Sequence, residues 1–263
     1  MLSFAKTTLA MFGVDAEPSA AAGILAADKA VALAPGLPEA YAARGHARMR
    51  AWNWAGAQAD YEKALQLDPN DAASQGRYGV FLAGFGRFEE AIAAAQRSVD
   101  LEPLNSSMWL CLGFSLSGAG QDAAARAAFT RMLEITPESS AAKLFLAQIE
   151  LREGRAEAAL KLNSQQTAER LRLVILAMAE HTLGHAEQSR QALDTLLANP
   201  GGDSADTALV YAWRGEADQA FEFLETAYRQ HSSSLWAIRI SALRTLRSDP
   251  RYKVFLRKMN LPE

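Results

Sequence analysis

Few segments of this 263-residue sequence carry residue types that could do chemistry. Residues 113–118 approach the nucleophile elbow of hydrolases, but that motif needs a preceding strand and a glycine where Ser117 stands. Residues 84–87 contain two glycines but lack the third glycine and the preceding strand of a dinucleotide-binding fingerprint. No nucleophile, base and charge-stabilising group are assembled together, so we predict that the chain is not an enzyme.

The candidate metal ligands are equally sparse. His181 and His185 are four residues apart, a spacing that could place two ligands on one helix face. Gly184 between them indicates a turn, and no third ligand stands nearby. Cys111 is the only cysteine, and its apolar neighbours indicate a small core residue rather than a metal or disulfide site. We therefore predict no metal and no cofactor.

The composition is that of an ordinary soluble protein, with 49% hydrophobic and 22% charged residues. The net charge of −3 gives no general attraction for nucleic acid. Residues 229–258 carry eight basic side chains and one acid, Asp249, which could meet phosphate or simply form a solvated cap. We expect the cap, and no nucleic-acid partner. No apolar run is long enough for a membrane span, and a cytoplasmic location is expected.

The elements that would hold any site follow a period of 34 residues. Four series share it: prolines that stop helices, glycines where a neighbouring helix approaches closely, glycines of inter-helix turns, and alanines of helix contacts. They stand at Pro35, Pro69, Pro103 and Pro137; Gly45, Gly79 and Gly113; Gly86, Gly120 and Gly154; and Ala57, Ala91, Ala125 and Ala159. This period predicts pairs of helices that bury their apolar faces against the next pair.

The most regular unit, residues 106–139, carries Trp109, Gly113, Ala125, Phe129 and Pro137 at the spacing of the tetratricopeptide repeat, which the chain resembles. The resemblance implies an all-α fold, a right-handed α-α superhelix of about six helix pairs plus a C-terminal capping helix. The expected segments are an incomplete N-terminal repeat (1–37), three regular units (38–139), three degenerate units (140–234) and a C-terminal cap (235–263).

The less regular parts resemble the C-terminal repeat region of bacterial winged-helix regulators and class III adenylate cyclases. The resemblance rests on the aromatic turn at Trp52 and Trp54 and on the closing run from Leu246 through Pro250 to Arg251. It implies a signalling context but supplies no catalytic residue. On this view the chain is either a stand-alone relative or a piece of a longer protein.

The resemblance also implies where a protein or peptide partner would bind, because ligands of such arrays lie along the concave face of the first helices. Register places these residues there: His46, Met49, Arg50, Val80, Leu110, Phe114, Leu144, Gln148, Leu151, Arg152, Met178 and Trp213. This mainly apolar surface suits an amphipathic helix or an extended peptide. Ala42 and Gly76 lack the polar groups of chaperone-tail clamps, so no such adaptor is expected.

Three interpretations of this surface remain open. The favoured one is a protein-interaction scaffold. The alternative is a sensory or regulatory module whose effector domain lies elsewhere. A third possibility is that the apolar positions pack against the chain's own C-terminal segment, around residues 236–246.

Overall fold

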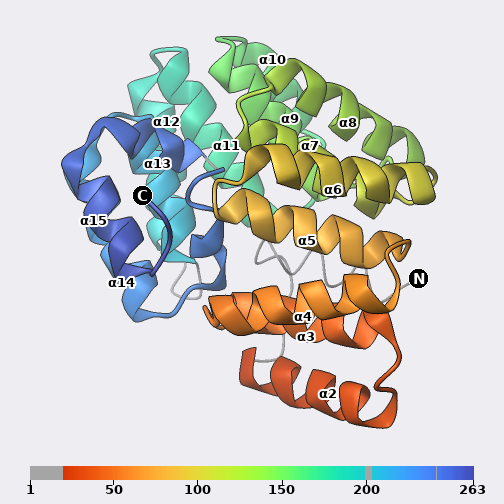
Figure 1. Cartoon of the computed structure of the whole chain (residues 1–263). Coiled ribbons are helices and arrows are strands. Elements are labelled where there is room, and N and C mark those ends of the chain that lie inside the picture. Colours follow the sequence, from red (N-terminus) through yellow and green to blue (C-terminus); the bar gives the residue numbers. More distant parts are fainter. Residues whose placement is uncertain (1–19, 199–202, 241) are drawn as a thin grey trace. The chain divides into compact units, whose positions relative to one another are not determined.

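The computed structural model describes residues 20–198, 203–240 and 242–263, and the described residues are helical with short connections and no strand (Figure 1). The predicted all-α fold of stacked helix pairs is therefore confirmed. The chain divides into two compact halves after Ile135, and each half is described by itself. The N-terminal expectation for residues 1–19 lies outside the described residues.

Over its described residues, 20–135, the N-terminal half holds one leading helix and three helix pairs (Figure 1). Within it, each first helix (α3, α5, α7) packs against its own second helix and against the next first helix. The helices are α2 (Ala20–Leu33), α3 (Pro38–Arg50), α4 (Trp54–Leu67), α5 (Ala72–Gly84), α6 (Phe88–Leu101), α7 (Ser106–Gly118) and α8 (Asp122–Ile135).

The C-terminal half repeats this arrangement with less regular members, and its first helices α9, α11 and α13 also pack in sequence. Its elements are α9 (Ser140–Arg152), α10 (Ala156–Asn163), α11 (Glu169–Thr182), α12 (Ala186–Leu197), α13 (Ser204–Trp213), α14 (Ala217–Arg229), the 3₁₀ helices η1 (Ser233–Ala237) and η2 (Ala242–Ser248), and α15 (Pro250–Lys258).

The periodic prolines stop the helices as expected. Helices α4, α6 and α8 each end two residues before their proline, because proline cannot continue the backbone hydrogen bonding. The next first helix then begins at a polar cap. The side chains of Asp71, Asn105 and Ser139 accept hydrogen bonds from backbone amides of the helices that they precede, at 2.8, 3.1 and 3.2 Å. Stop and start signals thus fix each repeat boundary locally.

The glycines inside the first helices mark close helix contacts. A Cβ added at Gly79 would lie 2.8 Å from the carbonyl oxygen of Ala91, and one at Gly113 would lie 2.6 Å from the Phe129 ring. Ala91 is fully buried, as the alanine series predicts. In both pairs the second helix approaches the glycine of the first helix too closely for a side chain to fit there.

The turn after each first helix contains a residue whose backbone has a positive φ, the left-handed conformation. Gly86, Gly120 and Gly154 have φ of 78°, 78° and 76°, as the second glycine series predicts. Trp52 stands 34 residues before Gly86, at the equivalent turn, and has a φ of 59°. A tryptophan therefore holds a conformation that the sequence elsewhere gives to glycine.

The period shortens in the C-terminal half because α10 has only 8 residues where α8 has 14. The loop after α10 carries no closing proline and is held by side chains instead. Lys143 Nζ donates to the Gln165 carbonyl at 3.1 Å, and Gln166 Nε2 donates to the Ser140 carbonyl at 3.0 Å. These contacts tie the 164–168 loop to the start of α9.

Candidate partner-binding surface

Three predicted residues of the N-terminal half are exact repeats of one position. His46, Val80 and Phe114 stand 34 residues apart on α3, α5 and α7, and these helices are neighbours. Their exposed fractions are 7%, 5% and 2%. Met49 and Leu110 are buried as well. The register thus brings the predicted residues onto adjacent first helices, but it places them out of contact with solvent.

The predicted residues of the C-terminal half behave similarly. Leu144, Gln148 and Leu151 on α9 and Met178 on α11 are all buried. Gln148 stands another 34 residues after Phe114 and so occupies the same repeat position. It is buried on α9 although its side chain is polar.

The polar residues at the ends of the first helices remain accessible. Arg50, Arg152 and Trp213 are half-buried, and each stands at or next to the last residue of its first helix. The indole Nε1 of Trp213 donates to Thr182 Oγ1 at 3.0 Å, which joins α13 to α11. Among the twelve predicted residues, these three are the ones that are not buried.

A buried titratable cluster lies in the N-terminal half and was not predicted. Burial lowers the pKa of His46 to about 3, assisted by the positive charge of Arg77, so the imidazole is neutral. Burial raises the pKa of the Tyr61 hydroxyl and raises that of the Cys111 thiol to about 12. Burial also lowers the pKa of Arg77. Burial thus favours the neutral forms of His46, Tyr61 and Cys111, so Cys111 is not a reactive thiolate.

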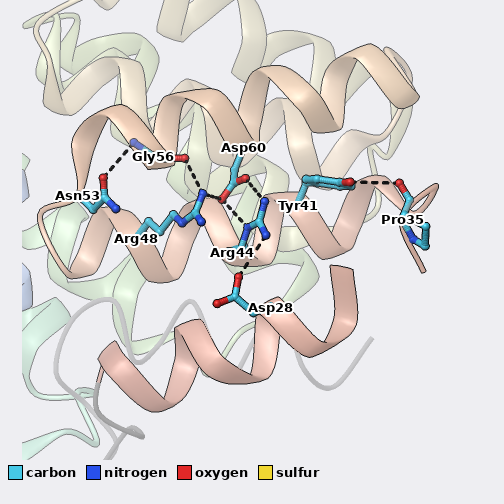
Figure 2. Close-up of polar contacts among 8 residues, drawn as sticks. All are labelled: Asp28, Pro35, Tyr41, Arg44, Arg48, Asn53, Gly56 and Asp60. Carbon is cyan, nitrogen blue, oxygen red and sulfur yellow. Dashed lines mark hydrogen bonds and ion pairs between the residues drawn. The ribbon is translucent and has the colours of Figure 1, made fainter. Parts of the chain in front are cut away.

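A second unpredicted feature is an ion-pair network that joins α2, α3 and α4 (Figure 2). Asp60, buried on α4, accepts from Arg44 Nε at 2.9 Å and Nη2 at 2.7 Å, and from Arg48 Nη1 at 2.8 Å. Arg44 Nη1 also donates to Asp28 Oδ1 at 3.1 Å. The hydrogen bond to Asp60 is the main reason that the pKa of Arg44 is raised.

Two arginines and two aspartates balance in charge, so no carboxylate or guanidinium of the network is left without an opposite charge. A sequence signal for it existed. The equivalents of Asp60 in the next two units are Ala94 and Ala128, so a lone carboxylate interrupts an alanine series. Arginines four residues apart on the facing helix, at 44 and 48, complete that signal.

Several residues of the candidate metal and phosphate features have partners within the chain. His185 lies outside α11, and its Nδ1 is 2.7 Å from Glu180 Oε2. Among the described residues, no three His, Cys, Asp or Glu side chains group closely enough to hold a metal ion. In the basic C-terminal segment, Arg251 pairs with Asp218 and Asp249, at 2.8 and 2.7 Å. Lys258 pairs with Glu225.

Hydropathy along the described helices gives one further result. None of them combines the length and the apolar character that crossing a membrane requires.

Comparison with known proteins places the fold. Residues 38–71 match the sequence model of the tetratricopeptide repeat. No curated protein matches the chain. PilW, a type IV pilus biogenesis factor, is similar in structure with a TM-score of 0.58 and 22% identity, over 66% of this chain and 82% of that chain.

Two further solved structures are similar. PilF of Pseudomonas aeruginosa has a TM-score of 0.55 and 17% identity, over 84% of this chain and 97% of its own. A chain of the APC/C Cut9–Hcn1 hetero-tetramer has a TM-score of 0.62 and 15% identity, over 89% of this chain and 45% of its own. At these identities the likeness shows the fold alone. The chain is thus an all-α solenoid that carries a tetratricopeptide repeat at residues 38–71.

Proposed function

We propose that the chain is a non-enzymatic scaffold that binds a peptide or helix of another protein along its first helices. The observation that supports this most is the alignment of apolar residues on neighbouring first helices, such as Val80 and Phe114, at the repeat interval. An apolar stripe of this kind matches the anchors of an amphipathic helix or an extended peptide.

The similar structures support an assembly role in general and no particular partner. One is a hetero-tetramer of two different proteins, and another is a pilus biogenesis factor. Because the apolar residues of the stripe are buried, a partner first meets the half-buried ends of the first helices, at Arg50, Arg152 and Trp213.

Site-specific photo-crosslinking in cells tests this proposal. A benzophenone amino acid replaces Arg50, Arg152 or Trp213 in three separate variants of the full chain. The matched controls carry it at Lys63 and Gln96, which are exposed on the second helices α4 and α6. Adducts are identified by mass spectrometry after irradiation.

The expected result is one protein that is crosslinked from at least two of the three first-helix positions and from neither control. Crosslinking of that protein from Lys63 or Gln96 alone would move the binding surface to the second helices and overturn the proposal. Absence of any specific adduct from all five positions would also contradict it.

A further inference from the structure

Two arginines of the C-terminal half contact each other and are held by backbone carbonyls. Arg239 Nη2 donates to the Pro262 carbonyl, and Arg247 Nη2 donates to the Arg239 carbonyl at 2.5 Å. A carbonyl orients a guanidinium group but carries no net charge. These contacts therefore fix the two side chains and leave both positive charges uncompensated.

No carboxylate neutralises this pair. Among the described residues, neither Arg239 nor Arg247 forms an ion pair with an aspartate or a glutamate. Burial lowers the pKa of Arg239, and the positive charge of Arg247 lowers it further. Burial raises the pKa of Tyr252 and both arginines oppose this rise, so the two guanidinium groups lie near one phenol. Like charges held together without a counter-ion cost free energy.

Arg239 also has a hydrogen-bond donor that no acceptor of the described chain meets. Its Nε is buried and has no partner there. A buried donor that is left unpaired costs free energy, so such a group indicates that a further molecule supplies the acceptor. The Tyr252 hydroxyl, which donates to the Ile238 carbonyl at 3.3 Å, is a further polar group beside the two arginines.

The basic residues of the adjoining helix α15 are arranged differently. Three of its four basic side chains pair with acids, and Lys253 is the exception. The pairs are Arg251 with Asp218 and Asp249, Arg257 with Glu263, and Lys258 with Glu225. These acids interrupt the positive surface, whereas a nucleic acid or an anionic membrane binds along a continuous one. The arrangement therefore favours one small anion.

We propose that Arg239, Arg247 and Tyr252 form a binding site for a single phosphate group that carries two negative charges. Two guanidinium groups match that charge, and their planar sets of N–H donors match the phosphate oxygens. A carboxylate would neutralise only one of the two arginines. The site lies apart from the twelve residues of the candidate surface in the sequence, so it goes beyond the proposed function.

An NMR titration of the full chain tests this site, with the arginine Nε–Hε signals as the readout. The probe is N-acetylphosphoserine amide, and N-acetylserine amide is the same molecule without phosphate. The Arg239 signal is identified by its loss in Arg239→Gln. It is expected to shift with the phosphoserine probe and to stay unchanged with the serine probe, because a phosphate oxygen then accepts from Nε.

Arg247→Gln should weaken binding of the phosphoserine probe by about tenfold or more, the effect of losing a charge-assisted hydrogen bond. Lys253→Gln is the matched control, because it removes the same charge from an exposed residue of the same segment. It should change the affinity by less than about twofold. Arg247→Lys keeps the charge but loses the planar donors, so its affinity should lie between the two. Circular dichroism checks that all variants keep the wild-type helicity.

Absence of a shift in the wild type would overturn the site. Equal weakening by Arg247→Gln and Lys253→Gln would show a general attraction for anions, which also overturns it. Tighter binding of N-acetylglutamate amide would replace phosphate by a carboxylate. Inorganic phosphate, titrated separately, identifies the source of the group: an affinity at least equal to that of phosphoserine indicates free phosphate, and a lower affinity indicates a phosphorylated side chain.

Discussion

In the N-terminal half, each helix pair closes at a glycine of its first helix, as Gly79 does against the Ala91 carbonyl, and a proline follows the pair. In the C-terminal half, the pairs are joined by specific polar side chains. Lys143 and Gln166 hold the loop after α10, and Asp203 holds the connection after α14.

The difference shows two ways to stack the same unit. Small residues and prolines act within one helix pair, so the same packing pattern can recur at a fixed period. Polar ties join residues far apart in the sequence, so each boundary is individual and its length can vary. The long connection of residues 230–249 lies at one of these variable boundaries.

The largest expected effect tests the ion-pair network of the regular half. Asp60→Ala gives the first pair the alanine that its neighbours carry, but it leaves Arg44 and Arg48 without their shared carboxylate. We expect a loss of about 3 kcal/mol in the free energy of unfolding, measured by urea titration. A loss below about 1 kcal/mol would mean that the network is dispensable and that the regular half needs no polar tie.

The next effect tests the small-residue rule itself. Gly79→Ala places a Cβ against the Ala91 carbonyl, so the helix pair must separate, at a cost of about 2 kcal/mol. Gly36→Ala is the control, because an added Cβ there meets nothing within 4 Å. Equal stability of the two variants in urea would contradict close backbone contact as the basis of the regular pairs.

The two halves are also expected to respond to pH in opposite directions. His46 has a folded pKa of about 3, so only the unfolded chain takes up a proton as the pH falls below the ordinary histidine value. Stability should fall by about 2 kcal/mol between about pH 7.5 and pH 5. His46→Leu should abolish this loss, and an unchanged slope in its urea midpoints would exclude His46 as the source.

In the C-terminal half, burial and the neighbouring Asp203 raise the pKa of Asp206 to about 6, against the opposing effect of Arg170. The folded form then favours the protonated acid, so this contribution is complete in acid and is lost as the pH rises through about 6. A quarter of the side chain remains exposed, so we expect a loss of about 1 kcal/mol.

Asp206→Asn should remove this pH-dependent loss of stability. The measurement is the stability of α13 from the hydrogen-exchange rates of its amides at several pH values. A slope of the opposite sign in the wild type would show that the ion pair with Arg170, at 2.6 Å, outweighs burial.

The smallest expected effect concerns the inter-helix turns. Gly120→Ala forces a left-handed conformation on alanine in open space and should cost about 1 kcal/mol. Trp52→Gly removes the same strain but also the indole, so the net change should stay within about 1 kcal/mol. A larger loss for Trp52→Gly in thermal unfolding would assign the ring a packing role that outweighs its strain.

The sequence was sufficient for the fold because its signals are local. Pro69 and Gly86 act on residues a few positions away, Gly79 acts on Ala91 within the same helix pair, and their period predicts the helix pairs directly. Local signals of this kind predicted only part of the candidate surface. Register put Val80 and Phe114 on adjacent helices, but burial depends on the whole three-dimensional packing, which a 34-residue period does not encode.

The polar ties were missed for the same reason. Asp203 and Ser232 are separated by a whole helix pair, and no spacing rule connects them. Asp60 is the exception, since a charge in an alanine series is visible in the sequence.

The burial of Cys111 has a practical consequence. Its thiol is enclosed in α7 and is the only one in the chain. Because the raised pKa keeps it protonated, a thiol-specific dye should modify it only when the surrounding helices part. The rate at which the dye modifies Cys111 therefore reports how often the helices around it open in the N-terminal half, and no engineered label is needed.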